Sequence, residues 1–395
     1  MGGETLNRQN QVAVTAATSV GGAKLPDLKV LIAAGGTGGH IYPCLAIGKE
    51  IMRREPTAQV KFVGTPGGME ERIISPAGFD LAFIDVKGLV RVGLTAQLRG
   101  LLLLPKSFLA VRRLIRDFAP DVVVGGGSYV SGPVVLTAAL MGIPTVVMEA
   151  HARPGVTNRI LARVVDKAAV WYETALPYFH GKGVVTGNPV RREFFDIPIK
   201  PHNGSDATVL VYGGSQAARA INEAVVAALD HLEPYRPNLR FVHETGASDY
   251  EQVLSAYRAA GWEASADVRK RIDNMPAAYA AADVIICRAG ASTCAELAAA
   301  RRAAILIPFP FAADDHQRQN ATALQQTGAA CIILQHELSG ERLAQDLGSL
   351  LANPDRIKQM ESAARKLARP DAAKVTVELI EQLVQAKRAA RKGNA

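Results

Sequence analysis

Short apolar runs alternate with amphipathic segments along most of the chain. From Leu28 onward, runs rich in β-branched residues recur between stretches whose apolar residues have helical spacing. The first series comprises KVLIAAGG, VKFVG, DVVVGGG and TVVMEA, and the second comprises ATVLVYGGSQ, LRFVHETG, ADVIICRAG and AAILIPFP. Strands that alternate with helices are typical of parallel sheets in α/β proteins. The pattern therefore predicts an α/β fold.

The two halves of the chain repeat one architecture. Each opens with a strand that runs into paired glycines, Gly35-Gly36 in the first half and Gly213-Gly214 in the second. Such a repeat favours two doubly wound parallel-sheet domains with a cleft between them over one large sheet. We expect the domains to span 28–187 and 188–370, after a disordered extension over 1–27 and before a helix with a basic tail over 371–395.

One uncharged stretch is long enough to be mistaken for a membrane span. Val122 to Met148 carries no charged residue, and a spanning helix needs only about 20 apolar residues. Glycines and prolines interrupt it, however, and divide it into a strand, a loop, a short helix, a turn and a second strand. We therefore expect a buried βαβ unit of a parallel sheet.

Composition narrows the class of protein without choosing a partner. A chain of 395 residues with 48% hydrophobic and 21% charged residues should fold into two globular domains. Its net charge of +8 suits an anionic partner, and nucleic acid, phospholipid head groups or pyrophosphate would all qualify. The cysteines form no CxxC pair, so neither a zinc site nor a disulfide framework is supported; they are Cys44, Cys287, Cys294 and Cys331.

Glycine-rich turns at the ends of predicted strands are the main chemical signal. Such turns bind phosphates because their backbone N–H groups and the positive end of the next helix face the anion. The first turn is not a dinucleotide fingerprint, because Ile41 stands where the third glycine would be, and the chain has no GxxxxGK[ST] motif. Four such turns occur, at Gly35 to His40, Gly125 to Pro133, Gly213 to Gln216 and Arg288 to Thr293.

The four turns should lie together, since ligands of open α/β sheets bind beyond the carboxyl ends of the strands. Two turns would then face the cleft from each domain. Glu296 follows the fourth turn by one helical turn. Its carboxylate could cap the helix or accept both hydroxyls of a ribose, and the residues alone leave both readings open.

Several motifs together resemble the MurG family. They are GGTGGH at 35–40, GSYVSGP at 127–133, GNPVR at 187–191, GGSQ at 213–216, RAGASTCAE at 288–296 and DDHQRQNA at 314–321. They occur in the family's order from about Lys29 to the C-terminus. The resemblance implies a GT-B fold and an inverting transfer of N-acetylglucosamine from UDP-N-acetylglucosamine to the 4-hydroxyl of N-acetylmuramyl-peptide pyrophosphoryl-undecaprenol. It implies no cofactor and no strict metal requirement.

The resemblance also assigns binding roles. It implies that the backbone of Ile272 contacts uracil, Glu296 the ribose, Arg191 and Ser215 the nucleotide, and Gln317 the sugar. The remaining donor contacts that it implies are Thr37, Gly38, Gly39, His151, Gln216, Ala291, Ser292 and Thr293. The acceptor pyrophosphate is expected at Gly36, Gly38, Gly39, Ser128, Tyr129, Ser131 and Gly132.

Inverting transfer needs a general base for the acceptor hydroxyl. That base must come within about 3 Å of the proton, with a pKa near the working pH. His40 fits by type and place because it follows the first phosphate turn directly. The alternatives are that His40 only orders the turn, or that Glu149 or His151 is the base.

A basic, leucine-rich stretch favours contact with an anionic membrane. Between Asp85 and Arg116 there are seven basic residues against one acid, with leucines and Phe108 among them. The basic residues are Lys87, Arg91, Arg99, Lys106, Arg112, Arg113 and Arg116. An apolar patch with a basic rim suits anionic lipid, although a core helix that packs Leu101 to Leu104 would show the same pattern. The expected location is the cytoplasmic face of the bacterial inner membrane, with cell-wall synthesis proteins as further partners and no nucleic acid.

Some positions depart from the MurG pattern and leave alternatives open. Ala150-His151 stand where the family usually has Gln-Asn, Ala217 replaces a glycine, and Arg301 and Ala303 occupy usual Gly and Pro positions. Arg301 removes an expected glycine helix stop. The alternatives are a UDP-N-acetylglucosamine 2-epimerase, which shares the two-domain plan but does not explain GSYVSGP, and a non-enzymatic two-lobed ligand-binding protein.

Overall fold

The computed structural model describes residues 25–86, 94–151, 153–202, 206–213, 218–312 and 315–393, and only the backbone of residues 94–105 and 392. Most of the expected N-terminal extension therefore lies outside the described residues. The same holds for Lys87, Arg91, Ser215, Gln216 and Ala217, and for the side chains of Arg99 and Leu101 to Leu104.

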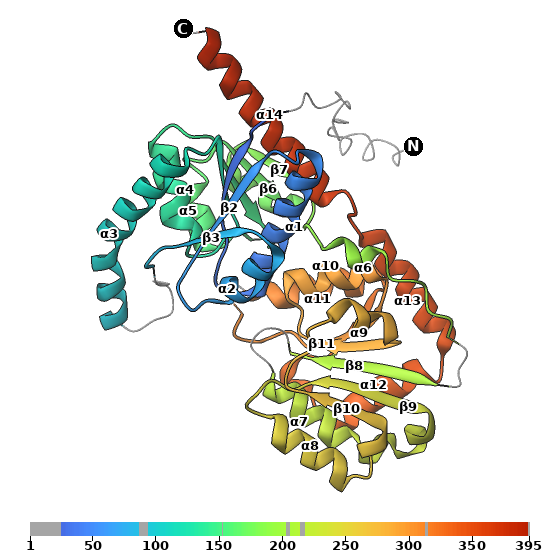
Figure 1. Cartoon of the computed structure of the whole chain (residues 1–395). Coiled ribbons are helices and arrows are strands. Elements are labelled where there is room, and N and C mark those ends of the chain that lie inside the picture. The colour runs from blue at the N-terminus through green and yellow to red at the C-terminus, as the bar shows by residue number, and fades with distance from the viewer. Residues whose placement is uncertain are drawn as a thin grey trace, which may run out of the picture.

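Two parallel sheets form the centres of two α/β domains (Figure 1). The first has seven strands in the order β3-β2-β1-β4-β5-β6-β7, and the second has six in the order β10-β9-β8-β11-β12-β13. The first sheet comprises β1 (Lys29–Ala33), β2 (Gln59–Gly64), β3 (Asp80–Phe83), β4 (Val122–Gly125), β5 (Thr145–Glu149), β6 (Lys167–Val170) and β7 (Gly183–Val185). The second comprises β8 (Ala207–Tyr212), β9 (Leu239–Glu244), β10 (Ala266–Arg269), β11 (Val284–Cys287), β12 (Ala303–Leu306) and β13 (Ala330–Ile332). The prediction of two doubly wound parallel-sheet domains is confirmed.

Helices cover both faces of each sheet, as the continuous apolar strands require. In the first domain they are α1 (Gly38–Arg54), α2 (Met69–Ile73), α3 (Leu94–Phe118), α4 (Ser131–Leu140) and α5 (Val156–Leu161). Those that follow are α6 (Arg192–Phe195), α7 (Arg219–Ala228), α8 (Tyr250–Ala259), α9 (Met275–Ala281), α10 (Ala291–Ala300), α11 (His316–Gln326), α12 (Gly340–Leu351), α13 (Pro354–Leu367) and α14 (Ala372–Gly393). Val122 to Met148 forms β4, α4 and β5, so the prediction of a buried βαβ unit is also confirmed. Every helix in the described part of the chain is too short or too polar to cross a membrane.

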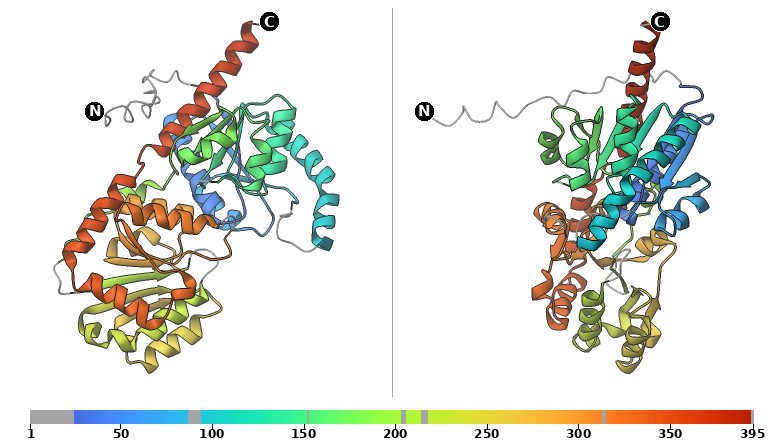
Figure 2. Two further views of the ribbon diagram at one scale, coloured as in Figure 1. Left: turned by 180° about the vertical axis from the view of Figure 1, so that it is seen from behind. Right: turned by 90° about the vertical axis from the view of Figure 1, so that its left-hand side faces the viewer.

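The last helix returns to the first domain. Figures 1 and 2 show α14 running along that domain, opposite to the side on which α3 projects. Val377 and Ile380 are buried in the same core cluster as β1 and α1. Arg54 of α1 donates to Glu378 and Glu381 of α14 at 3.2 and 2.7 Å. The chain therefore crosses between the domains twice, once before β8 and once before α14.

The sheet order creates the place for a ligand. In each sheet the chain reverses its direction of winding at the central pair, β1 and β4 in the first and β8 and β11 in the second. The crevice beyond the carboxyl ends of such a pair is the usual ligand site of doubly wound sheets. The four glycine turns follow these four strands, so the sheet order brings them to two facing edges.

Arg301 takes the left-handed conformation at the end of α10 that a glycine usually takes. Its φ is 53°, and its guanidinium donates to the carbonyl of Ile197 at 2.7 Å. The helix therefore still stops at Ala300, with a strained backbone and a tether to the interdomain segment.

Replacement of Arg301 separates the strain from the tether. Both Arg301→Ala and Arg301→Gly lose the bond to Ile197, but only glycine relieves the positive φ. We expect the glycine variant to unfold at higher urea than the alanine variant, by about 1 kcal/mol in the free energy of unfolding. Equal stability of the two variants would show that the left-handed backbone carries no strain here.

Candidate functional site in the interdomain cleft

His40 joins the first two glycine turns. It lies in the first turn of α1, and its Nδ1 is 2.8 Å from the carbonyl oxygen of Gly126 in the turn after β4. A carbonyl oxygen can only accept, so Nδ1 carries the proton and Nε2 keeps its lone pair. Burial lowers the pKa of His40, and the nearby His151 lowers it further. His40 is therefore a neutral imidazole near pH 7, ready to accept a proton at Nε2.

A proline in α1 helps to connect the first glycine turn, Gly35 to His40, to the fourth glycine turn, Arg288 to Thr293. Pro43 has no N–H to donate to the carbonyl four residues earlier, which is that of Gly39. That carbonyl instead accepts a hydrogen bond at 3.1 Å from the Oγ of Ser292, at the start of α10 in the other domain. The first turn of one domain and the fourth turn of the other thus meet across the cleft.

Glu149, at the end of β5, is committed to positioning its neighbours. One carboxylate oxygen accepts from the backbone N–H and the Nδ1 of His151 at 2.9 and 2.8 Å. The other accepts from Gly155 N and Asn158 Nδ2 at 3.0 and 2.9 Å. Burial opposes ionisation of Glu149, but the hydrogen bonds from His151 and Asn158 outweigh it and lower the pKa. A carboxylate with four donors and a lowered pKa is a poor general base.

Three histidines from distant parts of the sequence meet in the cleft. The ring centroids of His40 and His151 are 6.3 Å apart, and those of His151 and His316 are 4.5 Å apart. His151 contacts the carboxylate of Glu149 through Nδ1 at 2.8 Å. His316 begins α11 in the second domain, so the cluster spans the two domains. The described residues hold no group of three or more His, Cys, Asp or Glu side chains arranged to ligate a metal ion.

Arg191 and Glu296 form the second polar centre of the cleft. The Arg191 guanidinium lies 4.6 Å from the ring centroid of Tyr42 in the first domain and 4.8 Å from that of Phe194. Its Nη2 is 3.7 Å from Glu296 Oε1. Burial raises the pKa of Glu296 to about 7, against the opposing effect of Arg191. A carboxyl group that titrates near pH 7 in a cleft is a candidate ligand contact.

Comparison with known proteins places the chain. The model of the glycosyltransferase family 28 N-terminal domain matches residues 30–170, and that of the family 28 C-terminal domain matches 208–376. A protein of Anaeromyxobacter sp. (strain Fw109-5) is 46% identical over 360 residues, which cover 91% of this chain and 94% of that protein. One of Myxococcus xanthus (strain DK1622) is 46% identical over 349 residues, covering 88% and 91%. Both are named UDP-N-acetylglucosamine--N-acetylmuramyl-(pentapeptide) pyrophosphoryl-undecaprenol N-acetylglucosamine transferase.

The chain belongs to the MurG family.

Solved structures agree with this assignment. Acinetobacter baumannii MurG superposes with a TM-score of 0.71 at 32% identity, covering 90% of this chain and 99% of that one. The two parallel-sheet domains are thus the GT-B fold of MurG. A putative UDP-N-acetylglucosamine 2-epimerase from Listeria monocytogenes has a TM-score of 0.69, covering 91% and 97%, but is only 13% identical. That similarity shows a shared fold and nothing about the activity.

The residues expected to hold the MurG acceptor differ in their availability. Gly36 donates its N–H to Glu70 at 3.1 Å, and Ser131 Oγ is buried, where it donates to Ala33 O and accepts from Gly127 N. Tyr129, by contrast, is exposed at the turn. The hydroxyl of Ser128 is buried with no hydrogen-bond partner within the described structure. In the turns expected to bind the acceptor substrate, fewer hydrogen-bonding groups are therefore free than the motifs suggest.

Most of the residues expected to contact the sugar-nucleotide donor lie on the second domain, whereas Thr37, Gly38, Gly39 and His151 lie on the first. Ala291, Ser292, Thr293 and Glu296 occupy the first two turns of α10, and Gln317 lies on the first turn of α11. The Ile272 N–H already donates to Glu244 at 2.7 Å, which leaves the carbonyl of Ile272 for the expected contact with uracil. Gln317 Oε1 accepts from Phe309 N at 2.9 Å. Ser215 and Gln216 lie outside the described residues. The described donor residues and the described acceptor turns face one another across the MurG cleft.

Sequence reasoning missed four residues of this MurG cleft, which are Tyr42, Glu70, Phe194 and His316. His316 had a signal, because it lies within the DDHQRQNA motif at the start of a helix. Tyr42 and Phe194 had none, since only the tertiary structure places their rings against Arg191. Glu70 had no signal either, because it lies outside every motif described above.

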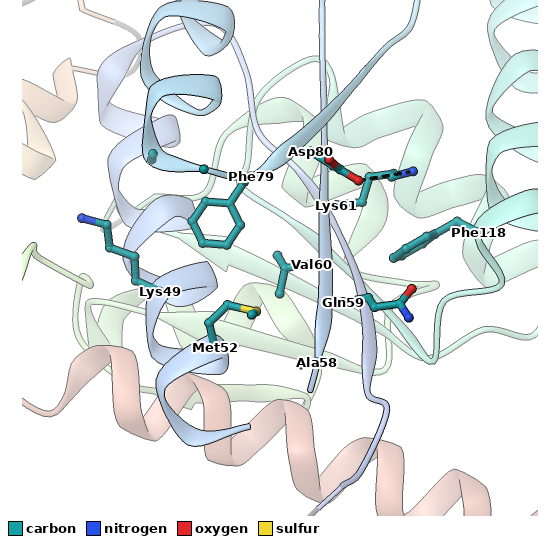
Figure 3. Close-up of a pocket in the computed structure, with 11 residues that line it drawn as sticks. Lys49, Met52, Ala58, Gln59, Val60, Lys61, Phe79, Asp80 and Phe118 are labelled. Carbon is teal, nitrogen blue, oxygen red and sulfur yellow. Dashed lines mark ion pairs between the residues drawn. The ribbon is translucent and has the colours of Figure 1, made fainter. Parts of the chain in front are cut away.

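A larger hollow lies away from the MurG cleft. A pocket of about 590 Å³ lies at the amino ends of β2 and β3. Figure 3 shows Phe79, Phe118 and Lys61 among the residues around it. The space lined by His40, Glu149 and Asn188 is about 10 Å³, room for a single water molecule. The larger hollow thus lies at the end of the sheet opposite to the glycine turns.

Proposed function

We propose that the protein transfers N-acetylglucosamine from UDP-N-acetylglucosamine to the 4-hydroxyl of N-acetylmuramyl-peptide pyrophosphoryl-undecaprenol, with inversion at the sugar. The observation that carries the proposal is 46% identity, over 91% of the chain, to a transferase named for this donor and acceptor. His40 and Glu296 lie on different domains and on opposite sides of the same cleft, which supports the proposal. The reaction is therefore a step in the synthesis of the lipid-linked precursor of peptidoglycan.

The two domains divide the substrates in this proposal. Residues 28–187 would hold the acceptor, with its pyrophosphate on the turns at Thr37 to Gly39 and Ser128 to Gly132. Residues 188–370 would hold the donor, with uracil at Ile272, the ribose on Glu296 and the sugar at Gln317. The short distance between Gly39 and Ser292 supports a transfer across the line where the domains meet.

The chemical step follows from the tautomer of His40. Nε2 takes the proton from the acceptor 4-hydroxyl as the oxygen forms its bond to the anomeric carbon. The bond from that carbon to the β-phosphate oxygen breaks, and its electron pair leaves with UDP. Arg191 and the amino end of α7 stabilise the charge that develops on the diphosphate, as oxyanion-hole donors do. The proposal needs no bound metal for this step.

Release of UDP tests this function. The purified protein is mixed with UDP-N-acetylglucosamine, with and without the lipid-linked muramyl acceptor, and UDP is measured. We expect release only with acceptor, to an equal extent in EDTA, together with a disaccharide-lipid product of inverted anomeric configuration. Conversion of the donor to N-acetylmannosamine, free or still bound to UDP, without acceptor would favour a 2-epimerase, and donor binding without any conversion would favour a ligand-binding protein.

We further propose that the first domain docks on the cytoplasmic face of the inner membrane. The exposed side of α3 carries Lys106, Leu109, Arg112, Arg113 and Arg116. Leu140 on α4 and Ile160 on α5 add large exposed apolar side chains on helices that pack in series with α3. Exposed leucine and isoleucine among arginines suit an anionic lipid surface, and cell-wall synthesis proteins at that surface are the partners we expect.

Reversal of charge on α3 should release the protein from vesicles. Arg112→Glu, Arg113→Glu and Arg116→Glu together should weaken binding to anionic vesicles at least about tenfold, because each nearby basic residue adds about 1 kcal/mol. Flotation measures this, and wild-type binding should fall with salt. The matched control reverses three exposed arginines of the second domain, Arg240, Arg258 and Arg342, and should float like the wild type. Equal flotation of both triple variants would contradict docking through α3.

A further inference from the structure

Glu70 lies buried beneath the first glycine turn, where no binding motif includes it. It belongs to the first turn of α2 and is 1% exposed. Its Oε1 accepts the N–H of Gly36 at 3.1 Å, and its Oε2 has no hydrogen-bond partner among the described residues. We propose that Glu70 is a positioning residue, which holds the turn at Gly36 to Gly39 in the form that binds the acceptor pyrophosphate. This inference rests on the proposed function.

Three glycines make room for this side chain. A Cβ added to Gly68 would collide with Glu70 Oε2, and one added to Gly64 would lie 2.9 Å from Glu70 Cγ. A Cβ on Gly35 would meet Glu70 Oε1. The three atoms nearest to such a Cβ on Gly68 belong to Glu70 and Thr65, and Gly68 has an ordinary extended backbone at φ −75°. Gly64 and Gly68 therefore make room for the side chain of Glu70, and Gly35 makes room for both Glu70 and Val130.

The bond from Gly36 decides which N–H groups of the turn remain for an anion. Gly36 has a φ of 87°, and its amide is already committed to Glu70. The amides of Gly38 and Gly39, in the first turn of α1, have no acceptor within the helix. Glu70 thus fixes the backbone immediately before the amides that can face the pyrophosphate, and before His40.

Glu70 also lies close to the second acceptor turn. A Cβ on Gly36 would come within 3.4 Å of Cε1 of Tyr129, and the hydroxyl of Tyr129 is 3.5 Å from Thr65 Oγ1. A displaced Gly36 would therefore disturb Tyr129 as well. Both acceptor turns depend on the position that the carboxyl group gives to one amide.

Substitution of Glu70 tests whether it acts by accepting that hydrogen bond. Glu70→Ala should lower kcat/KM for the lipid-linked acceptor about 10- to 100-fold, since it leaves the partly buried Gly36 amide without its hydrogen-bond partner. Glu70→Gln keeps an oxygen for Gly36 and should retain at least about a third of the wild-type value. The UDP dissociation constant should be unchanged in both, because the residues expected to contact uracil and ribose, Ile272 and Glu296, lie on the other domain. The matched control is Glu71→Ala, which removes the exposed neighbouring carboxylate.

Gly68→Ala gives a second approach that leaves Glu70 in place. Its Cβ should displace the carboxyl group and lower kcat/KM for the acceptor as Glu70→Ala does. In the double variant Gly68→Ala/Glu70→Ala the collision is gone, so we expect no loss beyond that of Glu70→Ala alone. Additive losses would show that Gly68 and Glu70 act separately.

The results distinguish failure of this inference from failure of the proposed function. If the wild type releases UDP with acceptor and Glu70→Ala retains wild-type kcat/KM, the inference is wrong and the function stands. If the alanine and glutamine variants lose kcat/KM and thermal stability equally, Glu70 is a structural residue and the inference is again wrong. If the wild type releases no UDP with acceptor, the proposed function itself fails.

Discussion

His40→Ala is expected to reduce kcat for UDP release about 10²- to 10⁴-fold, the range that a positioned general base contributes. The physical reason is the fixed tautomer: Nδ1–H donates to Gly126, and the lone pair on Nε2 has no replacement in alanine. UDP should bind as tightly as it does to the wild type, since the nucleotide contacts lie on the second domain. Single-turnover kinetics with saturating donor and acceptor measure the chemical step directly.

The pH dependence should identify the same group. Because burial lowers the pKa of His40, the wild-type kcat should be flat around neutrality and fall only on the acid side of the ordinary histidine value of 6.5. The matched control is His336→Ala, which removes an exposed histidine of the second domain. Near-normal turnover of His40→Ala at several pH values would remove His40 from this role, and a large loss in His151→Asn would then transfer it to the histidine paired with Glu149.

Glu296→Gln is expected to weaken UDP binding about 100-fold, because hydrogen bonds from two ribose hydroxyls to a charged acceptor become bonds to a neutral one. The amide keeps the size of the carboxylate but also loses the ion pair with Arg191. Calorimetric titration with UDP measures the affinity. Glu251→Gln, an exposed carboxylate of the same domain, should bind UDP like the wild type. Unchanged affinity in Glu296→Gln would exclude the ribose role.

Glu296 should also give UDP binding and folding stability opposite dependences on pH. Its pKa of about 7 in the folded protein lies above the ordinary value of 4.5, so folding favours the protonated form. Its contribution to stability is therefore complete below about pH 4.5 and is lost as the pH rises toward 7. The ionised form is the one proposed to accept the ribose hydroxyls, so UDP affinity should rise through the same range and up to about pH 8. Both dependences should disappear in Glu296→Gln.

The sequence predicted the glycine turns well because their geometry is local. A glycine is needed wherever the backbone takes a positive φ, as at Gly36 and Gly127, or approaches another segment closely. The alternation of strands and helices is also a local pattern, and it predicted that the turns follow strands. Which turns meet was not readable from the alternation, because it depends on the order of the strands in each sheet.

The contacts that join the domains show the limit most clearly. Pro43 is visible in the sequence, and its lack of an N–H frees a carbonyl in any helix. Ser292, some 250 residues away, donates to this carbonyl only because of the way the two domains pack against each other. The same holds for Arg191, whose place between Tyr42 and Phe194 needs rings from both sides of the cleft.

By itself, the sequence determined two parallel-sheet domains, glycine-rich turns at their strand ends, and membership of the MurG family. The domains and the turns follow from short-range rules, since helix and strand periods and glycine turns involve residues close together in the chain, whereas the family assignment rests on the resemblance of several motifs. Only the tertiary structure decided that the Glu149 carboxylate accepts four hydrogen bonds, that Glu70 accepts the Gly36 amide and that His40, His151 and His316 share one cleft. These depend on long-range packing, which sets hydrogen-bond partners and pKa values but leaves no periodic trace in the sequence.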